Sequence, residues 1–294
     1  MDNRNDIRQF LATRRARITP QQAGLPLYGG NRRVPGLRRE EVAILAGVSI
    51  DYYTRLERGN LNGVSESVLD ALARALQLDE AERAHLFDLA RTAKATPGTR
   101  RRPAQQRIRP GVQRILDAMT DAPAFVRNGR LDIVAANRLS RALYSPLFTD
   151  PADPTNLARF AFLDPRAHDF YPDWNDAANT TVALLRTEAG RDPYDRNLSD
   201  LVGELSTRSD EFRTRWAAHN VRLHHNGTKN FRHPVVGDLT LAFEAMPLPA
   251  DPGLTMTAYS AEPGSASHDG LTLLASWAAT LDQAGDAHAT DRTV

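Results

Sequence analysis

Apolar residues recur with a helical period through most of the first 92 residues. One amphipathic stripe runs through residues 4–17. After a Gly- and Pro-rich stretch the pattern resumes at Leu37 and continues to about Ala90. Ser65 and Asp79 each precede an apolar stripe, which is typical of N-cap residues. The pattern predicts five helices before residue 92, and therefore a compact all-α domain.

The pattern changes beyond residue 108. "PAFVRNGRLDIVAAN" holds two short β-prone runs around Asn128-Gly129, which predicts a hairpin. Residues 155–217 have helical periodicity. The segment 219–262 has four β-prone runs, "VRLHHN", "FRHPVVG", "DLTLAFEAM" and "LTMTAYSAE", separated by Asn-Gly, Gly-Asp and Pro-rich turns. With a last helix in "DGLTLLASWAATL", these elements predict an α+β domain with a mainly antiparallel sheet.

The boundary between the two patterns lies in "AKATPGTRRRPAQQRI", which has few large apolar residues and is typical of a linker. We therefore divide the chain into an all-α domain at 1–92, a linker at 93–108, an α+β domain at 109–280 and a disordered tail at 281–294.

Charge is distributed unevenly between the two parts of the chain. Residues 1–107 carry 19 Arg and Lys against 12 Asp and Glu, a net charge of +7, whereas residues 108–294 carry 18 against 24, a net charge of −6. A basic part joined to an acidic remainder indicates that the N-terminal part meets a polyanion, unless the arginines only form solvated faces.

Composition excludes several classes of protein. The 294 residues include no cysteine, which excludes disulfides and thiolate metal sites and is typical of a reducing compartment. The N-terminal segment "MDNRNDIRQF" lacks the apolar region of a secretory signal, and no apolar run approaches the length of a membrane helix. We expect a cytoplasmic protein with no membrane partner.

The segment "EEVAILAGVSIDYYTRLERG", residues 40–59, does not suit one long helix, because Gly47 and Ser49 would lie in its middle. Two short helices with a tight turn suit it better. Gly47 can take the left-handed conformation that a sharp turn needs, Val48 can fill the corner, and Ser49 can cap the second helix. This pattern is typical of a DNA-binding helix-turn-helix, and a plain αα-hairpin is the alternative.

The segment "PGLRREEVAILAGVS…YYTRLERG" resembles the helix-turn-helix of phage-repressor-like (XRE-type) regulators and, more narrowly, the MmyB-like regulators. The resemblance continues through "LDALARALQL", "FLDPRAHDFYPDW", "VGELSTRSDEFRTRW", "RHPVVGDLTLAFE" and "AYSAEPGS". It implies an N-terminal DNA-binding domain and a C-terminal PAS-like domain, a fold with which a fatty-acid-type ligand is associated.

The resemblance also implies which residues meet DNA. The start and next turn of the second helix would read bases through Ile50, Asp51, Tyr52 and Arg55. Arg55 suits guanine, Ile50 a thymine methyl group and Tyr52 a phosphate. Asp51 departs from the pattern, because phosphates repel a carboxylate; it would either accept from a cytosine amino group or only stabilise the helix N-terminus.

Phosphate contacts that set the register are expected from Arg38, Arg39 and Ser49. Arg32 and Arg33, in the preceding loop, would follow the phosphates or enter the minor groove, unless that loop is only solvated.

Two neighbouring residues have structural interpretations. We expect Glu57 to pair with an arginine of the first helix, such as Arg14, and Tyr53 to lie in the core.

The second domain offers no recognisable catalytic motif, because GxSxG, HExxH, P-loop and dinucleotide fingerprints are all missing. His219, His224, His225 and His233 lie close together in sequence, yet their spacing fits no usual ligand pattern. We therefore expect no enzyme activity, no metal and no cofactor.

A ligand pocket is one interpretation of the aromatic residues, and an ordinary core is the other. The expected lining residues are Phe162, Tyr171, Trp174 and Trp216. A bound carboxylate would need a polar partner at the pocket mouth, and His219 and Arg222 are the candidates.

Two classes of function follow. In the first, the protein is a ligand-responsive transcription regulator that binds an inverted repeat of double-stranded DNA as a homodimer at the nucleoid. In the alternative, the second domain serves only dimerisation or protein–protein contact.

Overall fold

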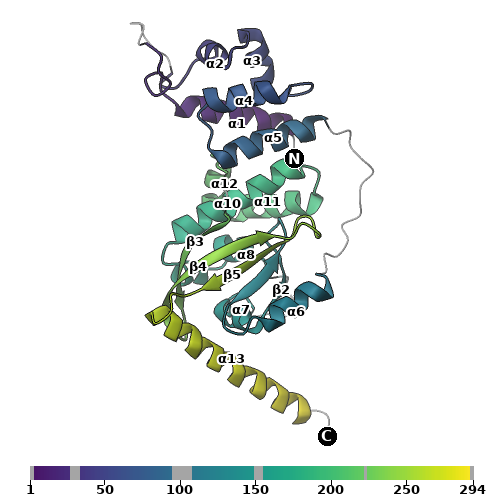
Figure 1. Ribbon diagram of the computed structural model, residues 1–294, viewed down its shortest axis with the longest axis vertical. Helices are drawn as coiled ribbons and strands as arrows, with labels where there is room; N and C mark the ends of the chain where they lie inside the picture. Colours follow the sequence, from purple (N-terminus) through teal and green to yellow (C-terminus); the bar gives the residue numbers. More distant parts are fainter. Residues whose placement is uncertain (1–2, 27–33, 95–107, 149–154, 222–223, 292–294) are drawn as a thin grey trace. The chain divides into compact units, whose positions relative to one another are not determined.

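The computed structural model describes residues 3–26, 34–94, 108–148, 155–221 and 224–291 (Figure 1). The chain forms two compact units. Unit 1 comprises Met1–Arg101 and Val182–Leu223, and unit 2 comprises Arg102–Thr181 and His224–Val294. The expected order of an all-α region followed by an α+β region with an antiparallel sheet is confirmed.

Unit 1 is built of helices. The N-terminal helices are α1 (Asn3–Arg17), α2 (Arg39–Ala46), α3 (Ile50–Glu57), α4 (Glu66–Ala75) and α5 (Glu80–Lys94). The later helices are the end of α10 (Trp174–Arg191), α11 (Arg196–Arg208) and α12 (Asp210–Ala217). The predicted caps are present, since the Ser65 hydroxyl accepts from the Val68 N–H and the Asp79 carboxylate accepts from the Glu82 N–H.

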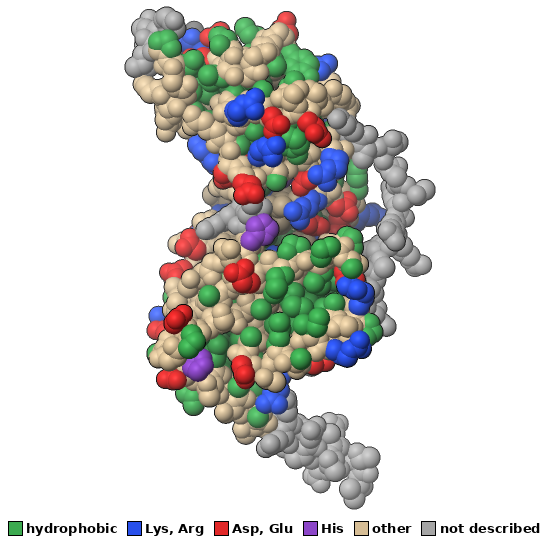
Figure 2. Space-filling model, in the orientation of Figure 1, with side chains coloured by type: hydrophobic (Ala, Val, Ile, Leu, Met, Phe, Trp, Pro, Cys, Tyr) green, Lys and Arg blue, Asp and Glu red, His purple; other side chains and the backbone are tan. Residues whose placement is uncertain are grey.

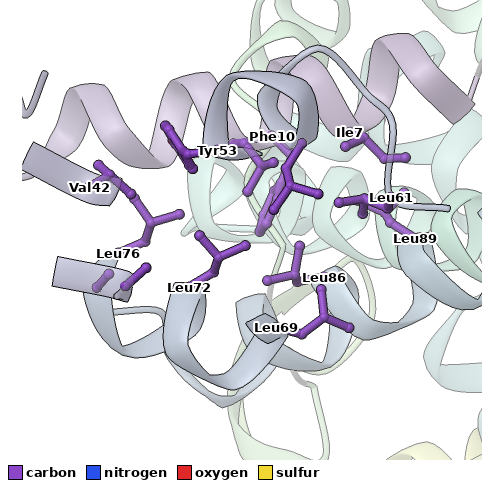
Figure 3. Packing of buried hydrophobic residues seen from close by; sticks show 14 of the residues in the cluster. Ile7, Phe10, Val42, Tyr53, Leu61, Leu69, Leu72, Leu76, Leu86 and Leu89 are labelled. Carbon is purple, nitrogen blue, oxygen red and sulfur yellow. The ribbon is translucent and has the colours of Figure 1, made fainter. Parts of the chain in front are cut away.

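The core of unit 1 forms where the apolar stripes of the first five helices meet (Figure 3). Ile7 and Phe10 of α1, Tyr53 of α3, Leu72 of α4 and Leu86 of α5 have no exposed surface. The prediction that Tyr53 belongs to the core is therefore confirmed. This core holds the short helices α2 and α3 in place, although eight residues alone form an unstable helix.

The segment 182–223 lies in unit 1, although the sequence placed it inside the second domain. Gly190 of α10 lies so close to α5 that a Cβ atom there would be 2.5 Å from the His85 ring. Val221 is buried in the same apolar cluster as the N-terminal helices. Packing against α1 and α5, rather than a break in the sequence pattern, sets this boundary.

Unit 2 combines a sheet with helices. Its helices are α6 (Pro110–Ala118), α7 (Arg138–Leu143), α8 (Leu157–Leu163), α9 (Arg166–Phe170), the start of α10 and α13 (Ala266–Asp291). Its strands are β1 (Ala124–Arg127), β2 (Ile133–Ala136), β3 (Asn226–His233), β4 (Gly237–Pro247) and β5 (Thr255–Ser260). The strand order is β2-β1-β5-β4-β3, and every pairing is antiparallel.

The two faces of this sheet have different side chains. In the strand register Lys229 lies opposite Leu241, and Phe243 lies opposite Tyr259. These four side chains therefore point to the same face of the sheet, which carries the main aromatic core. Val126 and Met256 lie on the opposite face with α6 residues. In the view of Figure 2, hydrophobic side chains gather over the sheet of unit 2.

The predicted strand "VRLHHN" is wrong in the part that is described. Val221 belongs to unit 1, and β3 begins only at Asn226. Asn226 and Gly227, predicted to form a turn, are the first residues of β3, while the turn follows His233. The strand is longer than its apolar run because main-chain pairing with β4 stabilises the exposed residues.

The last helix extends further than its apolar pattern. α13 continues to Asp291 and includes most of the segment expected to be a disordered tail. Among the described residues, no helix combines the length and apolar content that crossing a membrane requires.

Candidate nucleic-acid interface and ligand-domain core

The turn between α2 and α3 has the geometry that its sequence predicts. Gly47 takes the left-handed conformation, with φ 65° and ψ 33°, and its N–H donates to the Ile44 carbonyl. The Ser49 hydroxyl accepts from the Tyr52 N–H at 3.1 Å and caps α3. The two helices therefore meet in the tight turn of a helix-turn-helix rather than in an open hairpin.

The outer face of α3 presents the side chains expected to read bases. Ile50 is 51% exposed, and Asp51 and Arg55 are also exposed. The Arg55 guanidinium lies over the Tyr52 ring, 4.7 Å from its centroid. Stacking of this kind orients the arginine before any ligand arrives.

One exposed apolar residue beside the turn was not predicted from the sequence as part of this surface. Ile44 of α2 is 70% exposed, beside the turn. Its position off the core stripe of α2 was the signal that could have found it.

Arg39 and Glu57 form part of an ion-pair cluster at the base of the motif. The Glu57 carboxylate contacts the Arg39 guanidinium and lies 2.8 Å from Arg15 Nη2. The expected partner in the first helix is thus Arg15. Arg14 was the wrong choice, because its side chain is buried and pairs with Glu82 at 2.9 Å.

Three further arginines were predicted to contact DNA, and the structure describes one of them. Arg38 is exposed, its N–H donates to the Glu41 carboxylate at 2.6 Å, and its guanidinium lies 3.3 Å from Glu40. Arg32 and Arg33 lie outside the described residues.

A second cluster of buried charge joins the segment 182–223 to the N-terminal helices. Arg14 Nη2 donates to the His219 carbonyl at 2.5 Å, and Arg17 bridges Glu82 and Asn220, each at 2.8 Å. Both contacts connect α1 with the chain just after α12, so this region of unit 1 is held by paired charges as well as by apolar packing.

Arg186 of α10 makes a parallel set of contacts. Its guanidinium pairs with Asp6 at 3.2 Å, donates to the Trp216 carbonyl and lies 3.7 Å from the centroid of the Trp216 ring. Burial lowers the pKa of both Arg14 and Arg186 to about 10, which the carboxylates of Glu82 and Asp6 oppose. The two guanidinium groups therefore remain charged.

Two histidines lie within this cluster. Burial, reinforced by the positive charges of Arg186 and Arg14, lowers the pKa of His85 and of His219 to about 3. Both rings are consequently neutral at physiological pH, and His219 Nε2 contacts the Gln9 side chain.

The other histidines have separate surroundings in unit 2. His224 stacks on Phe243, and His233 Nε2 lies 3.0 Å from the Ala142 carbonyl. In the described part of the chain, no group of three or more histidine or carboxylate side chains is arranged to hold a metal ion.

The six proposed ligand contacts do not form one cluster. Tyr171, Trp174 and Phe162 lie together in unit 2, where the Trp174 indole N–H donates to the Ala161 carbonyl at 2.9 Å. Trp216 and His219 lie in unit 1 within the buried charge cluster. Arg222 lies outside the described residues.

The core of unit 2 is rich in aromatic rings that meet edge to face. Tyr144 and Tyr259 share a hydrogen bond between their hydroxyl groups at 2.6 Å, and the Tyr144 ring lies 5.7 Å from the Phe231 ring. Lys229 contributes a cation to this core, with Nζ 4.4 Å from the centroid of the Tyr171 ring. The aromatic residues thus form a core that also holds polar atoms.

Comparison with known families gives one match for each end of the chain, and the C-terminal match includes the segment 182–223, which packs in unit 1. Residues 108–274 match the family model described as MmyB-like transcription regulator ligand binding domain. Residues 7–86 match the family model described as helix-turn-helix domain. No curated protein matches the chain.

Proposed function

The chain belongs to the MmyB-like transcription regulators, and on that premise we propose that it binds an operator through α3 and responds to a small apolar, fatty-acid-like ligand. A ligand-responsive DNA-binding regulator is what the two matched domains establish, and both families are regulatory rather than enzymatic. The observation that carries the proposal for α3 is its exposed face with Ile50, Asp51 and the stacked pair Tyr52 and Arg55.

In this proposal α3 lies in the major groove. Arg55 donates to the O6 and N7 atoms of a guanine, and Ile50 contacts a thymine methyl group. Tyr52 contacts a phosphate, and Ser49 and Arg38 help to set the register. Arg39 is held by Glu57, so its charge is fixed in position but partly neutralised.

The test begins with selection of the operator from random duplexes by the full-length protein. Arg55→Ala should then reduce preference at one base position, at a cost of roughly 1–3 kcal/mol in discrimination. Arg74→Ala, an exposed arginine in the last turn of α4, is the matched control and should leave that preference intact. Equal binding of operator and random duplex by the wild-type protein would contradict the proposal.

Two-fold symmetry is the second part of the proposal. A single eight-residue helix reads only a few base pairs, so a homodimer on an inverted repeat supplies the specificity that a genome requires. The hydrophobic side chains that gather over the sheet support unit 2 as the dimer surface (Figure 2). Sedimentation should give a dimer at micromolar concentration, and a monomer both free and on DNA would contradict this.

The ligand should alter DNA affinity through a difference in its affinity for two states of the protein. α10 offers a route, because it begins among the aromatic residues of unit 2 and ends at the buried charges of unit 1. The linker at 93–108 is a second candidate route for this change, but it lies mostly outside the described residues.

Operator affinity should be compared for delipidated protein with and without a long-chain fatty acid. If delipidation and re-addition leave it unchanged, the alternative of a second domain that serves only protein contacts is favoured.

A further inference from the structure

The chain uses arginine for almost all its positive charge. Of 37 basic residues only Lys94 and Lys229 are lysines. Lysine differs from arginine in carrying a compact, strongly hydrated charge, which loses more than a guanidinium does when it is removed from water. The placement of Lys229 therefore calls for a physical explanation.

Lys229 lies on β3 with its ammonium group among aromatic rings. Nζ is 4.4 Å from the centroid of Tyr171 and 5.5 Å from that of Phe231. Phe231 in turn packs edge to face against Tyr259 at 5.5 Å. Ring faces attract a cation, but they do not neutralise its charge.

No carboxylate compensates this charge among the residues that the structure describes. Asp173, two residues beyond Tyr171, accepts a hydrogen bond from Asn230 Nδ2 at 2.8 Å. The charged group that acts on Lys229 is instead a second cation, Arg127 of β1. The hydroxyl groups of Tyr144, Tyr171 and Tyr259 lie in the same core.

Burial, reinforced by the positive charge of Arg127, lowers the pKa of Lys229 to about 8. The residue nevertheless retains accessible surface, since it is only half-buried. The side chain is therefore partly desolvated by the surrounding rings but can still be reached from outside. At neutral pH such an ammonium group is still mostly charged and is available to an anion.

We propose that Lys229, supported by the charge of Arg127, receives the carboxylate of a ligand whose apolar body lies among the aromatic rings of unit 2. This inference rests on the proposed function, in which unit 2 binds a small apolar ligand. It adds to that proposal a head-group site at Lys229, which replaces His219 and Arg222 in that role. A neutral ligand would leave the buried ammonium group uncompensated, and a cationic ligand would be repelled.

The test compares dodecanoic acid with 1-dodecanol, which have the same chain length but differ in charge. Delipidated full-length wild-type protein should bind the acid about tenfold or more tightly than the alcohol, since a hydrogen bond between charged groups is worth that factor. Lys229→Met should bind both equally, through loss of affinity for the acid alone. Lys94→Arg is the matched control and should keep the preference for the acid.

A spectroscopic measurement separates direct contact from a structural effect. Protein labelled with ¹⁵N-lysine gives two side-chain signals, and Lys94→Arg identifies that of Lys229. The pKa of Lys229 should rise when dodecanoic acid is added and remain unchanged with 1-dodecanol, because only the acid supplies a negative charge.

The outcomes distinguish the two proposals. If wild-type protein binds the alcohol as tightly as the acid, or if Lys229→Met keeps the preference, the head-group inference is overturned while the sensor proposal stands. If neither compound binds, or if binding leaves operator affinity unchanged, the fatty-acid sensor proposal fails. Absence of binding overturns the head-group inference as well.

Discussion

In unit 1 the buried guanidinium groups of Arg14 and Arg186 lie against carboxylates, whereas in unit 2 the ammonium group of Lys229 lies against aromatic rings. Burial lowers the pKa in both regions, but acids oppose the change in unit 1, and another cation, Arg127, adds to it in unit 2. A compensated charge holds segments of the chain together, and a charge without an acid is suited to receive a ligand. The presence or absence of an acidic partner therefore distinguishes a buried cation with a structural role from one suited to bind an anion.

The largest effect should follow removal of an acid from unit 1. Glu82→Gln leaves the buried Arg14 without its carboxylate and should lower the free energy of unfolding by about 3–5 kcal/mol. Urea unfolding followed by circular dichroism measures this. Glu80→Gln, an exposed residue of the same helix, is the control, and equal effects of the two variants would show that the pair is not structural.

Acidification should weaken unit 1 through its two neutral histidines. The pKa of His85 and of His219 is about 3 in the folded protein and about 6.5 when unfolded, so the unfolded chain binds more protons between these values. The stabilisation is complete above pH 6.5 and is lost as pH falls toward 3.

At about pH 5 each of these histidines should lower the free energy of unfolding by up to about 2 kcal/mol relative to its value above pH 6.5. Unfolding curves at about pH 7.5 and 5 test this. His219→Gln should reduce the loss and His268→Gln, which alters an exposed histidine, should not. A loss that His219→Gln leaves unchanged would contradict the assignment to His219.

The close approach of α10 to α5 can be broken without changing any charge. Gly190→Ala places a Cβ atom 2.5 Å from the His85 ring and should destabilise unit 1 by about 1–3 kcal/mol. Gly203→Ala on α11 is the matched control, since its Cβ meets no atom within 4 Å and should stabilise the helix by up to about 1 kcal/mol. Thermal unfolding of both variants measures the difference, and similar shifts would mean that the contact is loose.

Lys229→Met should cause the smallest change in the free energy of unfolding, and this change should have the opposite sign to that caused by Glu82→Gln. In ligand-free protein Lys229→Met removes a charge that has no acid partner among the described residues, so stability should be unchanged or rise by up to about 1 kcal/mol. The folded pKa of Lys229, about 8, lies below its unfolded value of 10.5, so wild-type stability should rise with pH above 8 relative to the variant. Urea unfolding between about pH 7 and 9.5 tests this, and strong destabilisation of the variant would assign Lys229 a structural role.

Local features of the sequence determined most of the elements. Gly47 and Ser49 fix the turn of the motif, because the left-handed conformation and the hydroxyl cap depend on those residues alone. The hairpin of β1 and β2 follows from two short β-prone runs on either side of Asn128-Gly129. The strand predicted in "VRLHHN" was wrong at its described residues before Asn226, because such a short run has the same pattern whether its valine packs on a sheet or on helices.

The sequence by itself determined the helix-turn-helix, the antiparallel sheet and the family, since these depend on periodicity, caps and motifs that neighbouring residues carry. Only the tertiary structure decided the partners of charges far apart in the chain. It joined Arg186 to Asp6, assigned Arg15 rather than Arg14 to Glu57, and placed Lys229 beside Tyr171. Pairing of distant charges depends on which helix faces come together, and one-dimensional spacing does not contain that information.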